Sequence, residues 1–395
     1  MTPKYPDLSD AVRAAEPELV RLRRELHAHP ELAFEERWTQ ARILDVLRQA
    51  DIPAEPLAET GVVAWIAGAD PGPVLLARAD TDALPITERS GCDYASRQPG
   101  RMHACGHDAH VAMLLTAARL LARRPPARGA VRLVFQPAEE RGAGAARMIA
   151  DGVLADPPVD MALAMHVWSG LATGTAVCRG GAAMAGLDSF ELIVSGRGTH
   201  AARPEEGVDP IPIAAQIAVA AQSLVARRLA PHQPAVLSFT AIQGGQSFNI
   251  IPERVLLRGT VRAYDAQVQQ LLLDELDQLA RAIADGLGAR AELTSGEHLP
   301  PLINDAGLAA RVRRTAAGLL GAEAVRAEEP LLVSEDFGLF CQQVPGAMLL
   351  LGCGDPAAAE VIPHHHPSFD VDEGALAIGV ELWLRLVAEL LEGDG

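Results

Sequence analysis

The chain has 395 residues, which at the usual domain size of about 100–200 residues indicates two domains. Lysine and arginine number 34 against 51 aspartates and glutamates, so the formal net charge is -17. An acidic surface repels phosphate backbones and anionic membranes, which argues against nucleic-acid and membrane partners. Five scattered cysteines suit free thiols in a reducing compartment, and the charged N-terminus does not resemble a secretory signal. We therefore expect a cytoplasmic protein.

The first part of the chain alternates between helical and strand patterns. Apolar residues recur at helical spacing over residues 16–27 and 37–50. Four apolar runs predict strands, and helices are predicted between some of them. Such alternation indicates a largely parallel sheet covered on both faces. The predicted strands cover residues 62–67, 74–79, 131–135 and 161–165, and the intervening helices cover 108–123 and 144–150.

The middle of the chain has a different order of elements. Its patterns predict strand, helix, strand, strand, helix and strand, which is the ferredoxin-like order. Such a unit closes on itself, so we predict that it is a domain inserted into the α/β domain. These elements cover residues 189–195, 210–229, 236–242, 255–262, 266–287 and 289–294, and α/β character returns with a strand at 347–352 and a helix from 373. The predicted boundaries are 1–185 and 298–395 for the two parts of the α/β domain and 186–297 for the insertion.

Titratable residues follow three of the four predicted strands in the first part. Asp80 and Asp82 follow the second strand, Glu139 and Glu140 follow the third, and His166 follows the fourth. Sites in open α/β sheets form at the carboxyl ends of the strands. The pattern therefore predicts a site at this edge, against the alternative that the loops are simply polar.

Candidate metal ligands are dense between residues 102 and 110, which include three histidines and Cys105. Thiolate and imidazole are strong transition-metal donors, and the N-terminus of a following helix favours the thiolate. Cys105 could instead be a nucleophile beside His107, although residues two apart seldom face each other productively. Histidines at 364–366 are either an incidental tract or the source of a further ligand. With Glu139 or Glu140 and with His166, this donor set fits one or two Zn, Mn, Co or Ni ions better than Ca or Mg.

Adjacent glutamates at 139 and 140 suggest a division of roles. One carboxylate can bind metal while its neighbour stays unbound and takes a proton from water activated by the metal. The alternative is a pair of solvated acids.

Three polar residues of the predicted insertion also stand out. His200 follows a strand and a glycine-rich loop, Asn249 lies between apolar residues, and Arg262 ends a strand. Arginine together with an amide suits a carboxylate ligand. Each residue alone is also consistent with a solvated turn.

These motifs resemble the metal-dependent amidohydrolases that include hippurate hydrolase, bacterial N-acyl-amino-acid amidohydrolases and plant auxin-conjugate hydrolases, within the aminoacylase and carboxypeptidase superfamily. The resemblance runs nearly end to end. It is carried by RRELH at 23–27, RADTDALP at 78–85, MHACGHDAH at 102–110, FQPAEE at 135–140, His166, GTHAA at 198–202, NIIP at 249–252, GTVR at 259–262, SEDF at 334–337 and HHPSF at 365–369.

The resemblance implies particular roles for these residues. Two divalent metal ions are expected on Cys105, His107, Glu140, His166 and His365, the last chosen from the three histidines by the motif His-x-Pro-x-Phe. Glu139 matches the general acid/base, and Asp82 matches an acid that orients a ligand. His200 is expected to reach the site of a neighbouring subunit and stabilise the oxyanion. Asn249 and Arg262 match groups that hold the substrate carboxylate.

The resemblance also implies the fold and the reaction. We expect a zinc-peptidase-like three-layer α/β domain with an inserted ferredoxin-like α+β dimerisation or lid domain, in a homodimer or larger homo-oligomer. The expected reaction cleaves an N-acetyl, N-benzoyl or similar N-acyl amino acid into a carboxylic acid and an amino acid. A carboxypeptidase or dipeptidase of the same superfamily is the alternative. A non-catalytic metal- or peptide-binding protein is a further alternative, but a binder has no use for a general acid/base such as Glu139.

Overall fold

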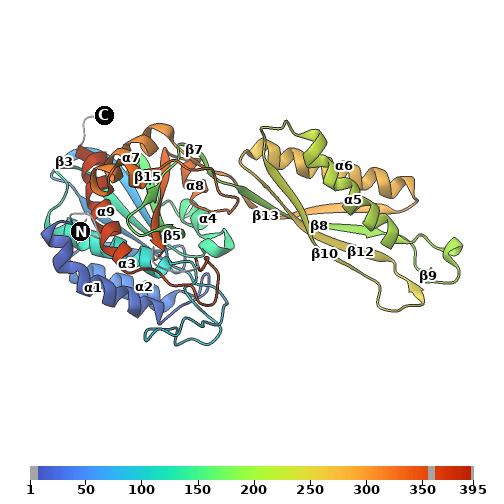
Figure 1. The fold of residues 1–395 in the computed structure, drawn as a ribbon, viewed down its shortest axis with the longest axis horizontal. Helices are drawn as coiled ribbons and strands as arrows, with labels where there is room; N and C mark the ends of the chain where they lie inside the picture. Colours follow the sequence, from blue (N-terminus) through green and yellow to red (C-terminus); the bar gives the residue numbers. More distant parts are fainter. Residues whose placement is uncertain (1–7, 355–360, 393–395) are drawn as a thin grey trace. The chain divides into compact units, whose positions relative to one another are not determined.

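The computed structural model describes residues 8–354 and 361–392, which form two compact units (Figure 1). Unit 1 contains residues up to Ala183 together with Ile303–Glu329 and the residues from Leu339 onward, and unit 2 contains Met184–Leu302 and Pro330–Gly338. The short segment 330–338 belongs to unit 2 because the Ala185 amide donates to the carbonyls of Leu331 and Val333, at 2.9 and 3.0 Å. The predicted domain boundaries and the roles assigned to the domains stay predictions.

The described part of unit 1 contains an eight-stranded mixed sheet in the order β1-β2-β4-β3-β5-β16-β6-β15. The four central strands, β4, β3, β5 and β16, are mutually parallel. Their almost continuous burial agrees with the predicted parallel sheet. The strands are β1 (Ala54–Leu57), β2 (Gly61–Ala67), β3 (Asp70–Asp80), β4 (Arg128–Gln136), β5 (Met161–Ala172), β6 (Ala176–Val177), β15 (Val325–Arg326) and β16 (Gly346–Gly354).

Helices pack around this sheet and close the core of unit 1. Helix α3 contacts α1, α2 and α9, and nearly all of its side chains are buried because small and apolar residues surround its axis. The helices are α1 (Asp10–His27), α2 (Arg37–Gln49), α3 (His107–Arg123), α4 (Gly144–Ala150), α7 (Ala306–Leu320), α8 (Gly338–Cys341) and α9 (Gly374–Glu392). In the part of the chain that the structure describes, no helix is both long and apolar enough to cross a membrane.

One strand is longer than the sequence pattern predicts. Strand β5 continues beyond residue 165 to Ala172, so the prediction that His166 follows the end of its strand is wrong. β16 pairs with the extension at residues 166–168, where Leu350 lies opposite His166, and again at Ala172, which lies opposite Gly354 after a shift in register. His166 therefore projects from a fixed sheet position.

Unit 2 has the predicted ferredoxin-like order of elements. Its four-stranded sheet is antiparallel in the order β10-β12-β8-β13, and α5 and α6 pack together over the buried residues of these strands. The α+β unit expected from the sequence is thereby confirmed. Its elements are β8 (Gly186–Ser195), α5 (Pro210–Arg228), β10 (Ala235–Gly244), β12 (Arg254–Ala263), α6 (Ala266–Gly286) and β13 (Arg290–Leu299), with β9 (Thr199–His200) paired to β11 (Ile250–Ile251). Where the chain passes between the two units, β7 (Gly181–Met184) is paired to β14 (Leu302–Asn304).

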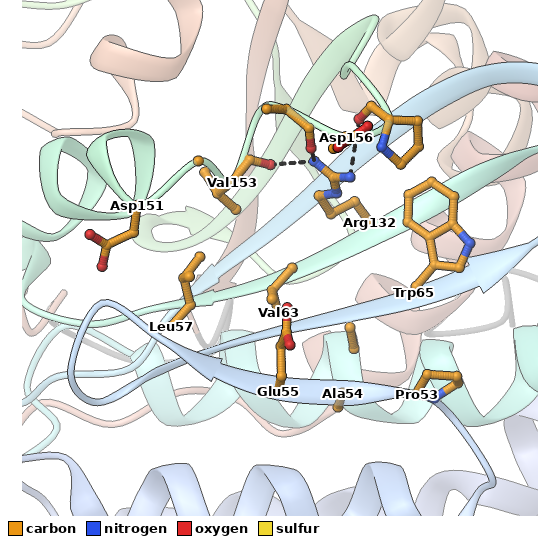
Figure 2. A pocket seen from close by; sticks show the side chains of 14 residues that line it. Pro53, Ala54, Glu55, Leu57, Val63, Trp65, Arg132, Asp151, Val153 and Asp156 are labelled. Carbon is orange, nitrogen blue, oxygen red and sulfur yellow. Dashed lines mark hydrogen bonds between the residues drawn. The ribbon is translucent and has the colours of Figure 1, made fainter.

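A pocket of about 580 Å³ lies against β1, β2 and the loop 151–157 of unit 1 (Figure 2). The Arg132 guanidinium donates to the carbonyls of Val153, Ala155 and Pro157 at 2.6–3.0 Å and stacks over Trp65. These bonds hold the loop against the sheet. No predicted site residue lines this pocket.

Candidate active site

The predicted strand ends meet as expected at one edge of the sheet in unit 1. Strand β3 ends at Asp80, which lies opposite Gln136, the last residue of the parallel strand β4. Two residues later Asp82 is almost fully buried, and the single-turn helix η1 (Glu139–Arg141) follows β4. Parallel register thus places the acids at 80, 82, 139 and 140 in one layer.

Gly106 shapes the loop that carries Cys105 and His107. It precedes α3 with a φ of 89°, a left-handed conformation that favours glycine, and a Cβ there would lie 2.4 Å from Val167 Cγ2. The resulting close turn sets Cys105 Sγ 3.6 Å from His166 Nε2.

His107 is oriented by Asp82. Its Nδ1 donates to the Asp82 carbonyl at 2.9 Å, which leaves Nε2 facing the two glutamates. The distances from Nε2 to Glu139 Oε2 and to Glu140 Oε1 are both 3.9 Å. Burial lowers the pKa of the imidazole, but the charges of Asp80 and Asp82 outweigh that effect and raise it to about 10.

The turn that carries the two glutamates is held by the same aspartate. The Asp82 carboxylate accepts hydrogen bonds from the amides of Glu139 and Glu140, at 3.1 and 3.0 Å. Behind the turn, a Cβ on Gly144 would lie 1.6 Å from the Pro137 carbonyl oxygen, so only glycine allows α4 to begin there. Both glutamate side chains are therefore placed by backbone contacts.

The structure distinguishes the three consecutive histidines near the C-terminus. His365 Nε2 lies 3.4 Å from Glu140 Oε1, and its amide donates to the Ala104 carbonyl at 2.8 Å. His364 Nε2 instead accepts from the Ser169 amide, and His366 Nδ1 accepts from the Ser368 amide, both at 3.1 Å. His365 is thus the histidine of this run that faces the glutamates.

Two groups of ligand-type atoms share Glu140, and within each group all atoms lie within 4.8 Å of one another. One group contains Cys105, Glu140 and His365, and the other contains His107, Glu139 and Glu140. Among the described residues, His107 Nε2 and Glu140 Oε1 are buried without a hydrogen-bond partner. Unsatisfied buried polar atoms are costly, and nitrogen, sulfur and oxygen donors together suit a zinc-like cation. The residues present therefore fit divalent metal ions.

Sequence reasoning did not assign roles to Asp80 and His110, although both belong to a buried group with His107 and His166. Asp80 lies 2.7 Å from Arg78 Nη1 and 2.5 Å from His110 Nδ1. Burial opposes ionisation of Asp80, but His107, His110 and Arg78 hold its pKa well below the usual value. Two signals were available: Asp80 ends its strand, and His110 follows His107 by three residues, which places both on one helix face.

The three predicted site residues of unit 2 do not all come together. His200 is exposed on β9 next to Asn249, whose carbonyl accepts from the Ala201 amide at 3.0 Å. Arg262 lies opposite Leu187 at the other end of β8, whereas Arg254 lies opposite Ser195 at the end near His200. At about 3.3 Å per residue, the span from Leu187 to Ser195 is roughly 26 Å.

Arg262 already has partners within unit 2. Its Nη1 donates to the Leu332 carbonyl and to Ser334 Oγ, both at 3.0 Å. We expected Asn249 and Arg262 to hold one carboxylate together. Within a single copy of unit 2 these two residues lie too far apart to do so.

An α/β unit with cysteine, histidine and glutamate donors at its strand ends, joined to a ferredoxin-like unit, defines a class of hydrolases. The chain belongs to the peptidase family M20/M25/M40, whose model matches residues 76–389. The predicted resemblance to metal-dependent amidohydrolases is confirmed, and the chain is a hydrolase of this family.

Individual relatives cover almost the whole chain. It is 39% identical to the N-acetylcysteine deacetylase of Bacillus subtilis (strain 168), over 97% of this chain and 99% of the relative. It is 36% identical to thermostable carboxypeptidase 1 of Saccharolobus solfataricus, over 94% and 95% of the two chains. The solved YXEP protein of Bacillus subtilis, described as a dinuclear metal binding peptidase of the M20 family, is 35% identical with a TM-score of 0.84, over 97% and 100%.

The geometry predicts that Glu140→Ala lowers metal content, because the carboxylate shared by both groups of ligand atoms is lost. Elemental analysis of the purified variant after dialysis measures this. Glu323→Ala, which removes an exposed carboxylate, is the control and should retain the metal content of the wild type. Full metal content in Glu140→Ala would contradict the ligand assignment.

Proposed function

We propose that the chain hydrolyses the amide bond of N-acyl amino acids, releasing a carboxylic acid and a free amino acid. The observation that carries the proposal is the pair of adjacent carboxylates. Glu140 faces His365, while Glu139 Oε2 lies 3.9 Å from His107 Nε2 at the same cluster. A carboxylate beside a metal site can act as a general base. The similarity to an N-acetylcysteine deacetylase supports an acyl amino acid as substrate.

The proposed cofactor is a pair of divalent ions of the Zn, Mn, Co or Ni kind. The residues that would hold them are Cys105, His107, Glu140, His166 and His365. Glu140 belongs both to the group with Cys105 and His365 and to the group with His107 and Glu139. Such ions, when bound, polarise an amide carbonyl and lower the pKa of water toward ~7. The similarity to a dinuclear metal binding peptidase supports two ions.

Within this proposal Glu139 moves the proton. Its carboxylate takes a proton from the water that attacks the amide carbon and then gives it to the leaving nitrogen. Asp82 holds the Glu139 amide and orients His107, so the base and a ligand are fixed by one aspartate. This agrees with the orienting role that the resemblance implies for Asp82.

Residues of unit 2 are proposed to bind the substrate. His200 would stabilise the tetrahedral oxyanion, and Asn249 and Arg262 would hold the carboxylate of the amino acid. Because Arg262 and Asn249 lie at opposite ends of the sheet in unit 2, one copy cannot present both to one carboxylate, whereas two copies can. This supports the proposal of a homodimer in which His200 and Asn249 complete the site of the partner subunit.

Two further points belong to the proposal. The 36% identity to a carboxypeptidase supports hydrolysis of peptides as the second candidate activity. We also propose a cytoplasmic location, which suits the five free cysteines of the chain.

We predict that the purified enzyme, loaded with Zn, Mn, Co or Ni in turn, hydrolyses N-acetyl and N-benzoyl amino acids faster than dipeptides. Substrates with an amidated carboxyl group should react more slowly, because the charge-assisted bond to Arg262 is lost. Release of free amino acid measures the rates. Faster cleavage of dipeptides would favour the carboxypeptidase or dipeptidase alternative.

Glu139→Gln should retain metal but lose turnover, because the amide cannot accept the proton from water. General acid/base catalysis contributes about 10²–10⁴-fold, so kcat should fall at least into that range. Steady-state kinetics and elemental analysis on the same preparation separate the two effects. A near-normal kcat would show that another group moves the proton.

Mixing two inactive variants tests whether His200 completes the active site of the partner subunit. His200→Ala and Glu139→Gln should each be inactive, but a mixed dimer has one site with Glu139 intact and His200 supplied by the other chain. After subunit exchange, activity should return to at most about a quarter of the wild-type rate if pairing is random. If exchange is demonstrated and no activity returns, His200 acts within its own chain or has no catalytic role.

A further inference from the structure

Glu36 is a buried carboxylate that the proposed chemistry does not use. It precedes α2, yet its side chain makes no hydrogen bond to the helix that it caps. Instead Oε1 accepts from the Ala138 amide at 2.9 Å, and Oε2 accepts from Thr60 Oγ1 at 2.6 Å. Ala138 lies 102 residues away in sequence and directly precedes the two glutamates of the site.

The contact with Ala138 completes a row of three bonds. The consecutive amides of Ala138, Glu139 and Glu140 each donate to a buried carboxylate, the first to Glu36 and the other two to Asp82. Both acids lie outside the turn: Glu36 directly precedes α2, and Asp82 follows β3. Each amide of this turn therefore has a fixed acceptor.

The backbone at Ala138 needs such a partner. Its φ of 53° and ψ of 37° are left-handed, a conformation that is unfavourable for residues other than glycine. The side chain of Ala138 is fully buried, so water cannot replace Glu36 as the acceptor of its amide. Packing fixes the same turn, because a Cβ on Gly61, which follows Thr60, would lie 2.8 Å from Pro137 Cδ.

We propose that Glu36 is a positioning residue that fixes the turn 137–140 through the Ala138 amide and so sets the places of Glu139 and Glu140. This proposal rests on the proposed function, in which Glu139 moves the proton and Glu140 binds metal. Glu36 touches neither substrate nor metal. Its effect passes through one backbone hydrogen bond to the residues that do.

Three substitutions of Glu36 retain, weaken or remove the hydrogen bond from the Ala138 amide. Glu36→Gln keeps the volume and an oxygen acceptor for the Ala138 amide, and its NH2 group can donate to Thr60 Oγ1, which reverses the bond that Thr60 donates in the wild type. Glu36→Asp keeps the charge but shortens the side chain, and Glu36→Ala removes the acceptor. Metal affinity, measured by chelator competition without substrate, and kcat at saturating metal should fall about 10–100-fold in Glu36→Ala, as for groups that orient metal ligands. Glu36→Asp should lie between, and Glu36→Gln should match the wild type.

The chain offers a matched control for a merely structural loss. Glu381 is a buried carboxylate whose Oε2 also accepts from one backbone amide and one hydroxyl, those of Ser9, at 3.1 and 2.7 Å, while its Oε1 accepts from Arg385 Nε at 2.8 Å. Glu381→Ala should lower Tm but leave metal affinity and kcat unchanged. The KM of Glu36→Ala should also stay near the wild-type value, because the substrate contacts assigned to unit 2 are intact.

The proposal is overturned if Glu36→Ala binds metal and turns over like Glu381→Ala at a similar loss of Tm, or if Glu36→Gln is as impaired as Glu36→Ala. Should Glu36→Ala not fold, Glu36→Asp decides the same question against Glu381→Ala. The metal measurement needs no substrate, and kcat is taken on whichever amide the wild type cleaves. If the N-acyl amino acid assignment is wrong, the substrate tests on the wild-type enzyme show it. If the role of Glu36 is wrong, only the comparison of the variants shows it.

Discussion

The carboxylates of Asp80 and Asp82 at the end of β3 constrain the whole site, because both are buried in the interior of unit 1. A buried carboxylate must be paired or hydrogen-bonded to be tolerated. Asp80 is paired with Arg78 and His110, and Asp82 contacts His107 and the amides of Glu139 and Glu140. The start of α3 is thus held by both acids, and the turn after β4 is held by Asp82, which lies two residues beyond the end of β3. The proposed metal ligands His107 and Glu140 are therefore placed by their contacts with Asp82.

Unit 2 adds a different constraint. Its βαββαβ order makes β12 run from the end near His200 toward the end near Gly186, so Arg262 is separated from Asn249 by the length of the sheet. The separation follows from the antiparallel pairing of β12 with β8 and does not depend on any side chain of the site. In the proposal, a single copy of unit 2 therefore contributes to two different sites, with His200 and Asn249 at one end and Arg262 at the other. This is why oligomerisation and catalysis are linked in the proposal.

Periodicity predicted most of the helices and strands, because the patterns reflect burial on one face or on both. The strand-end rule also located Asp82, Glu139 and Glu140 at one edge of the sheet. Contacts between distant segments were beyond this reasoning: Asp80 meets His110 across 30 residues, and Glu36 meets Ala138 across 102. The pattern also ended β5 too early, since the pairing of β16 past His166 depends on tertiary structure. Local sequence shows which residues suit the chemistry, but their supports come from packing.

A second ionic group, mostly buried, lies next to the segments that carry the proposed metal ligands. Asp108, which follows His107, lies 2.8 Å from both Arg23 Nε and His27 Nδ1, and Arg23 Nη2 lies 2.8 Å from Asp370 Oδ1. Burial lowers the pKa of His27, but Asp108 and Glu88 raise it to about 9, so the imidazole is charged at neutral pH. Nearby His103 stays neutral, because burial lowers its pKa to about 3. Helix α1 is thereby tied to the start of α3 and to the segment after His365. Arg23, His27 and Asp108 are buried, and through these contacts they fix the start of α3 at His107, next to Cys105, and the segment that follows His365.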